Sequence, residues 1–130
     1  MTLVIFRDET ATGRTLGEFT LPDLPDSITA RELVRLRVRE EVARHNAAPS
    51  PHFRGLVKPT DAEADLNGYR MRSARPLDWE KQADAAEAAF ARNGFILLIG
   101  DRQIDDLDEK IALLGDPVVS FIKLVPLVGG

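Results

Sequence analysis

Hydrophobic and polar positions near the start of the chain follow the pattern of a β-hairpin. Residues 2–8 are rich in β-branched and aromatic side chains, which predicts a strand. The turn that follows contains Gly13, a residue type that readily adopts the positive φ of a tight connection. A second strand is expected from residue 15 to about residue 21, closed by Pro22 and Pro25. We expect the two strands to pair in antiparallel orientation.

The pattern then changes to the period of an α-helix. Thr29 and Glu32 have the spacing of a capping box, and the apolar residues at 28 and 33 have that of a hydrophobic staple. An apolar stripe recurs at every fourth position and consists of Ala30, Val34, Val38 and Val42. Leucines beside this stripe widen the apolar arc, so we expect a second element besides a sheet to cover the helix. The helix should end near Asn46.

The middle of the chain has fewer clear signals. Four prolines and scattered polar residues between positions 47 and 76 predict a loop, with a short strand at 54–57. Alanine is abundant from Leu77 to Asn93, which predicts a second helix that Gly94 stops. Its apolar face would consist of Trp79, Ala83, Ala86 and Phe90. This second helix is our candidate for the element that covers the first.

The last third of the chain returns to strand patterns. The continuous apolar run at 95–99 predicts a strand that is buried on both faces. A turn at Gly100 and Asp101 should lead into a short returning strand at 102–104.

The remaining segments complete the predicted architecture. Residues 106–114 are expected to form a helical turn that ends at Gly115, and residues 118–125 to form the final strand. A hairpin, a crossing helix and a last strand beside the first predict an α+β fold, in which a mixed sheet packs on one main helix. An insertion of helix and loop at about 47–93 separates that helix from the third strand.

Composition limits the class of protein. A chain of 130 residues has the length of one domain, and 44% hydrophobic with 29% charged residues is typical of a globular protein. No apolar run approaches the length of a membrane helix and no signal-peptide pattern is visible, so we expect a soluble, cytoplasmic protein. The formal net charge of −4 disfavours extensive binding to nucleic acid or to an anionic membrane.

The side chains do not suggest an enzyme or a metal site. The chain has no cysteine, which excludes disulfides, thiol nucleophiles and thiolate zinc sites. His45 and His52 lack companions that would complete a metal site, and the acidic segment 61–68 does not fit a calcium loop. We interpret that segment as a solvated loop and both histidines as surface residues. The carboxylates between residues 105 and 109 lie where a helix would begin, a position that acidic residues favour without any catalytic role.

Three segments of the chain resemble ubiquitin and its relatives. The turn at residues 10–16 is similar to the first hairpin turn of ubiquitin, with Ala11 in place of a leucine. Residues 96–106 resemble the family's strand, glycine turn and strand, with one extra residue in the turn. The final strand leads to Gly129 and Gly130, which resemble the conjugation tail. The insertion has no counterpart in ubiquitin.

This resemblance implies the β-grasp fold, with residues 1–130 as a single ubiquitin-like domain and residues 126–130 as a flexible C-terminal tail. It also implies a protein modifier. An activating enzyme would use ATP to adenylate Gly130, a conjugating enzyme would pass it to target proteins, and a deconjugating peptidase would release it. Two glycines suit this chemistry because they lack Cβ and have wide φ/ψ freedom. The alanine- and arginine-rich composition is typical of a bacterial protein, and we expect no cofactor on the chain itself.

The resemblance also indicates which residues would meet partners. The tail offers Pro126, Leu127 and Val128 to an activating enzyme, whereas the tail of ubiquitin carries arginines. The exposed apolar patch of ubiquitin would correspond to Ala11, Leu97, Leu124 and Val125, with the register of the last strand deciding between the final two. A slip of one residue exchanges the buried and exposed sets of a strand, so core positions for Leu97 and Leu124 are slightly favoured.

Two other functions fit the same pattern. A sulfur carrier would use Gly130 as a thiocarboxylate, but such carriers are usually compact and the insertion argues against this interpretation. A non-covalent ubiquitin-like binding module would recognise a partner through the insertion and would not need its tail. Removal of Gly129 and Gly130 would separate this last function from the other two.

Overall fold

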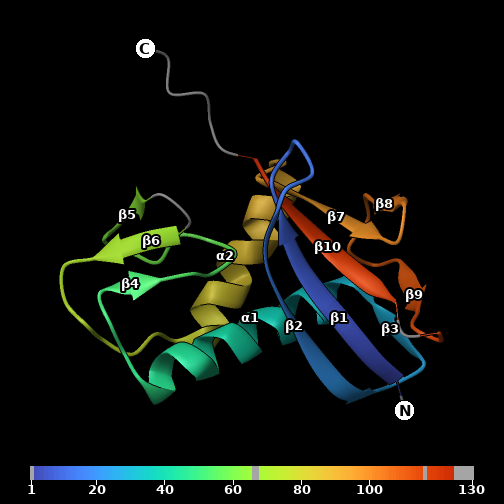
Figure 1. Cartoon of the computed structure of the whole chain (residues 1–130), viewed down its shortest axis with the longest axis horizontal. Helices are drawn as coiled ribbons and strands as arrows, with labels where there is room; N and C mark the ends of the chain where they lie inside the picture. The colour runs from blue at the N-terminus through green and yellow to red at the C-terminus, as the bar shows by residue number, and fades with distance from the viewer. Residues whose placement is uncertain (1, 66–67, 116, 125–130) are drawn as a thin grey trace. The chain divides into compact units, whose positions relative to one another are not determined.

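The computed structural model describes residues 2–65, 68–115 and 117–124. It divides the chain into two compact units, one formed by Met1–Arg31 with Phe90–Gly130 and the other by Glu32–Ala89. The helices and strands of both units are shown in Figure 1. The described residues contain a mixed sheet and two helices, which confirms the expected α+β class.

A five-stranded sheet forms the first unit, in the order β2-β1-β10-β7-β8. Its strands are β1 (Thr2–Glu9), β2 (Thr15–Leu24), β7 (Phe95–Ile99), β8 (Arg102–Ile104) and β10 (Val118–Lys123). β1 and β10 run parallel, whereas the other neighbouring pairs are antiparallel. The predicted N-terminal hairpin and the pairing of the last strand with the first are therefore confirmed.

One face of this sheet carries the apolar core of the unit. Val4 and Phe6 on β1 are buried together with Val119 and Phe121 on β10. The Phe6 ring lies 5.3 Å from the ring of Phe19 and 6.1 Å from that of Phe121, measured between centroids. The contact with Phe121 joins the parallel strands β1 and β10, which are distant in sequence, and that with Phe19 joins the two strands of the hairpin.

The second strand is longer than the sequence predicted. Pro22 does not close β2, because the register shifts between the pairs Val4–Leu21 and Thr2–Leu24 and leaves Pro22 and Asp23 in a bulge. Asp23 adopts a φ of 65° there. β2 lies at the edge of the sheet, where a proline removes no ladder hydrogen bond.

A separate two-stranded sheet pairs β3 (Ser27–Thr29) with β9 (Lys110–Ala112). The predicted helical turn at 106–114 is therefore wrong. The carbonyls of Leu107 and Glu109 accept hydrogen bonds from the N–H groups of Arg31 and Ala30, at 2.8 and 2.9 Å. Residues 107 and 109 are thus used to satisfy the first N–H groups of a helix, and the chain continues as a strand.

That helix is α1 (Ala30–Ala47), which begins directly after Thr29 and ends one residue beyond the predicted Asn46. The apolar stripe predicted from the sequence is buried, with exposures of 0–2% for Ala30, Val34, Val38 and Val42. A second helix, α2 (Trp79–Ala91), also forms as expected.

Contacts within the second unit join the two helices. Arg35 on α1 forms ion pairs with Asp84 at 2.9 Å and with Glu87 at 2.6 Å on α2. These carboxylates raise the pKa of the Arg35 guanidinium. Arg35 and Arg39 also lie 5.7 and 5.5 Å from the centre of the Trp79 ring. The expectation that α2 covers part of α1 is confirmed by these contacts.

Both ends of α2 differ in detail from the prediction. The carboxylate of Asp78 accepts hydrogen bonds from the N–H groups of Glu80 and Lys81, so Asp78 caps a helix that begins two residues later than expected. At the other end Asn93, and not Gly94, takes the positive φ, at 60°. The predicted apolar face is partly correct, because Ala83 and Ala86 are buried whereas Trp79 and Phe90 are half-buried.

The prediction of a loop at 47–76 is wrong, because this segment contains a three-stranded antiparallel sheet. Its strands are β4 (His52–Phe53), β5 (Ala62–Asp65) and β6 (Gly68–Met71), in the order β4-β6-β5. The short strand expected at 54–57 is absent from the described structure. Phe53, Ala62 and Met71 are buried on one face, and this apolar face explains why a polar, proline-containing segment folds.

A buried ion pair within α1 is also hydrogen-bonded to the segment after β4. Arg37 and Glu41 are 1% and 7% exposed, and their nearest charged atoms are 3.0 Å apart. The second carboxylate oxygen of Glu41 accepts a hydrogen bond of 3.0 Å from the N–H of Leu56. Burial raises the pKa of the nearby Tyr69 phenol; the charge of Glu41 adds to this effect and that of Arg37 opposes it.

Candidate functional site

The residues predicted to be activated, Gly129 and Gly130, lie outside the described residues, as do Val125, Pro126, Leu127 and Val128. The structure describes the strand that leads to them. β10 lies in the centre of the five-stranded sheet, with β1 on one side and β7 on the other. After β10, the N–H of Leu124 donates a hydrogen bond of 3.3 Å to the carbonyl of Gly94.

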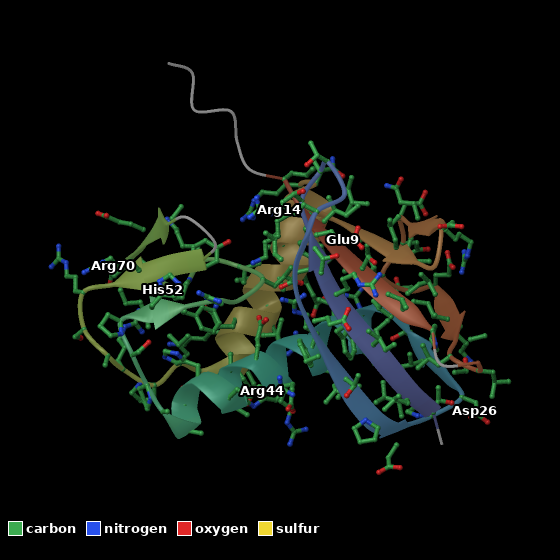
Figure 2. The ribbon with its side chains drawn as sticks, viewed as in Figure 1. Glu9, Arg14, Asp26, Arg44, His52 and Arg70 are labelled. Atoms are coloured by element: carbon green, nitrogen blue, oxygen red, sulfur yellow. The ribbon has the colours of Figure 1, made fainter. Side chains whose placement is uncertain are left out.

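Strand directions determine what surrounds this end of β10. Because β1 and β10 are parallel, Glu9 lies opposite Ile122, and the turn between β1 and β2 lies at the same end of the sheet. Figure 2 shows Glu9 and Arg14 there, and Asp26 at the far end of the β1–β2 hairpin. Gly13 adopts the predicted positive φ, at 90°. The turn is closed by the Thr10 N–H, which donates to the Arg14 carbonyl at 2.8 Å.

The charged side chains beside β10 are paired with one another. Arg7 Nε donates to Glu18 at 3.0 Å, and its guanidinium lies 4.0 Å from the carboxylate of Glu9. The hydroxyl of Ser120 on β10 donates to the same carboxylate at 3.3 Å. This hydrogen bond joins the side chains of two neighbouring strands, β1 and β10.

One residue of the predicted partner patch is wrong. Leu97 is 0% exposed and lies opposite Phe121, which is also buried. Ala11 is exposed in the first turn, as the patch requires, and Val125 lies outside the described residues. The core position that the sequence slightly favoured is therefore confirmed for Leu97 and wrong for Leu124, which is 38% exposed.

The alternation of β7 places its neighbours Ile96 and Leu98 on the opposite face of the sheet. Both are half-buried, which corrects the prediction that this strand is buried on both faces. Ile96 lies opposite Ile122, and Leu98 opposite Ser120. The half-exposed apolar residues of this face are Ile5, Ile96, Leu98, Val118 and Ile122.

Sequence reasoning missed these apolar residues because the run at 95–99 contains no polar residue that marks its phase. The polar residues of β10 do not show which of its residues face the core either. Ser120 is 5% exposed although it lies opposite the half-exposed Leu98, and Lys123 lies opposite the buried Phe95. Only the register between β7 and β10 separates the two faces.

The other sequence candidates have structural positions. His45 lies with its Nε2 2.8 Å from the carbonyl of Arg75, and its ring contacts the edge of Phe53, so it is a structural residue and not a free surface histidine. His52 is half-buried on β4. The acidic segment 61–68 is largely β5 and the start of β6. In the described parts of the chain, no three His, Asp or Glu side chains gather in a way that could hold a metal ion.

Neither helix, as far as the structure describes them, is long and apolar enough to cross a membrane. Comparison with known proteins found no match: no family model, curated protein or solved structure is similar to this chain.

Proposed function

We propose that this chain is a ubiquitin-like protein modifier with a β-grasp fold, activated at Gly130 and conjugated to target proteins. The observation that carries the proposal is the parallel pair of β1 and β10 in the centre of a mixed sheet. A hairpin, a following helix, and a last strand that returns between β1 and β7 support a β-grasp arrangement. The two terminal glycines support the activity.

The chemistry would take place in partner enzymes. A carboxylate oxygen of Gly130 attacks the α-phosphorus of ATP, and pyrophosphate leaves. A cysteine thiolate of the activating enzyme then attacks the acyl adenylate and releases AMP. Transfer to a conjugating enzyme exchanges one thioester for another, and a target amine finally displaces the thiolate and loses a proton. Because glycine has no side chain, Gly129 and Gly130 present no Cβ that would hinder each attack.

The position of β10 supports this role. A strand held by neighbours on both sides gives a firm base for the residues after it. The hydrogen bond from Leu124 to Gly94 anchors the last described residue to the chain that precedes β7. The half-exposed apolar residues Ile96, Leu98 and Ile122 are the best-supported contact surface for partner enzymes on this unit.

The proposal is tested by expressing the tagged chain in its native cells. We expect bands of higher mass that survive boiling in detergent and reducing agent, because an isopeptide bond is covalent and contains no thiol. Deletion of Gly129 and Gly130 should abolish these bands. The matched control is Gly17→Ala, since a Cβ at Gly17 meets nothing within 4 Å.

The same experiment separates the other functions. A sulfur carrier would give no bands of higher mass, and its C-terminus would show the exchange of one oxygen for sulfur. A non-covalent binding module would still bind its partner after deletion of Gly129 and Gly130. Either result would overturn the proposal.

A further inference from the structure

The three-stranded sheet of the second unit has one face that is rich in charge. Residues directly opposite each other in antiparallel strands share a face. His52, Arg70 and Glu63 therefore form one row across β4, β6 and β5. Figure 2 shows Arg70 and His52 on their neighbouring strands. The opposite face carries the buried residues described above, so the charged face is the outer one.

Three arginines lie along β6 and the end of β4. Arg72 lies two residues after Arg70, and both are exposed. Gly68 lies two residues before Arg70 and has no side chain. The Cα and Cγ atoms of Arg54 lie 3.3 and 3.4 Å from the position that a Cβ at Gly68 would take, so Arg54 occupies the space of the missing side chain. We call Arg54, Arg70 and Arg72 the arginine row.

These guanidiniums have no internal counter-ion within the described residues. None of the three forms a salt bridge or a side-chain hydrogen bond there. Arg35 in the same unit differs, because it binds two carboxylates. A guanidinium offers five N–H donors. Because Arg54, Arg70 and Arg72 are exposed, these donors are accessible to a partner.

A hollow adjoins the arginine row. Its volume is about 340 Å³, and it is lined by the charged residues Arg70, Arg72, Asp61 and Glu63 together with Ala62 and Met71. This volume is within the range of ligand-binding clefts, roughly 300–1,000 Å³. The hollow is basic along β6 and acidic along β5, so it suits an occupant that carries both signs of charge.

We propose that the arginine row binds an extended acidic peptide segment of a partner protein. Alternate side chains of an extended peptide are spaced about 6.8 Å apart, which is also the spacing of alternate residues along β6. Carboxylates at alternate positions can therefore meet successive guanidiniums, which bind carboxylates in bidentate geometry. A basic residue of the same segment would lie near Glu63.

Other occupants fit the outer face less well. The continuous negative backbone of a nucleic acid would pass close to Asp61 and Glu63, which line the same hollow. Single-stranded nucleic acid also needs aromatic side chains for stacking. Phe53 is buried, and Tyr69 is paired with it on the same inner face of the sheet, so neither ring lies on the outer face.

This proposal does not depend on conjugation through Gly130. The arginine row belongs to the second unit, whereas the strand that leads to the tail belongs to the first. Deletion of Gly129 and Gly130 should therefore leave peptide binding unchanged, and loss of the arginine row can be tested without any activating enzyme.

Fluorescence anisotropy of a labelled Glu-Val-Glu-Val-Glu peptide at low salt tests the proposal with the full chain. The double variant Arg70→Gln/Arg72→Gln should lower the affinity by about tenfold or more, because two charge-assisted contacts are lost. Arg92→Gln is the matched control, since Arg92 is an exposed arginine of the first unit and should not affect binding. Glu63→Gln should strengthen binding about two- to fivefold by removing a like charge. The fluorescence of Trp79 reports whether each variant is folded.

Three outcomes would overturn the proposal. The first is that the wild-type chain binds Gln-Val-Gln-Val-Gln as tightly as the glutamate peptide. The second is that a folded Arg70→Gln/Arg72→Gln variant keeps full affinity. The third is that oligodeoxythymidine binds the same arginines more tightly than the peptide, which would make the face a nucleic-acid site.

Discussion

Replacement of Glu41 by alanine should strongly destabilise the second unit. The buried Arg37 would lose the carboxylate that neutralises it, and the N–H of Leu56 would lose its acceptor. Breaking a buried ion pair by removing one partner costs about 3–5 kcal/mol. With a urea slope of about 1–3 kcal/mol per molar, a loss of this size lowers the unfolding midpoint by roughly 1–5 M.

The assay is urea unfolding followed by the fluorescence of Trp79, the only tryptophan in the chain and a residue of the second unit. The matched control is Glu40→Ala on the same helix. Glu40 pairs with Arg44 at 3.1 Å, but the side chains are 34% and 54% exposed. Removal of such a surface pair should cost at most about 1 kcal/mol.

A second variant tests the cause. Arg37→Met/Glu41→Leu removes both charges together, and it should be more stable than Glu41→Ala alone, because the penalty comes from the uncompensated guanidinium. The reasoning is refuted if Glu41→Ala and Glu40→Ala have equal effects, or if the double variant is the less stable of the two.

Three more predictions test the fold. Leu97→Ala should lower the free energy of unfolding by about 2–5 kcal/mol, whereas Leu124→Ala should change it by less than about 0.5 kcal/mol, as urea unfolding would show. Gly55→Ala places a Cβ in steric conflict with the buried ring of Phe53, so it should lower the free energy of unfolding by about 1–3 kcal/mol in the same assay. Gly17→Ala, whose Cβ meets nothing within 4 Å, should leave it nearly unchanged. Burial raises the pKa of Tyr69 above its usual 10.0, so the folded state holds this proton more tightly. Stability should therefore fall as the pH rises through 10 toward the raised pKa, and Tyr69→Phe should reduce this fall in alkaline unfolding curves.

Local signals were enough to predict the elements that depend on neighbours in sequence. The capping-box pattern at Thr29 and Glu32 and the apolar residues at every fourth position predicted α1, with its end correct to within one residue. Gly13 marked the first turn correctly because a positive φ is a local property. The strongest apolar segments also predicted β1, β7 and β10, and with them the mixed sheet.

Non-local pairing explains most of the errors. Residues 105–109 have the acidic composition of a helix start, but the carbonyls of Leu107 and Glu109 accept hydrogen bonds from the first N–H groups of α1. β4 contains two residues, and it is stabilised by register with Tyr69 and Arg70 on β6, which no local pattern reveals. Leu97 was assigned to the partner patch from the resemblance to ubiquitin, and the unbroken apolar run around it has no visible phase that could have settled its face. The role of Gly129 and Gly130 stays a prediction.

Mass spectrometry of tryptic peptides from native cells tests the central claim most directly. Lys123 is the last basic residue, so trypsin should leave Leu-Val-Pro-Leu-Val-Gly-Gly attached to the side chain of an acceptor lysine. A protein modifier predicts this branched remnant on lysines of other proteins. Recovery of the C-terminal peptide only in linear form, from cells in which the protein is abundant, would contradict the account.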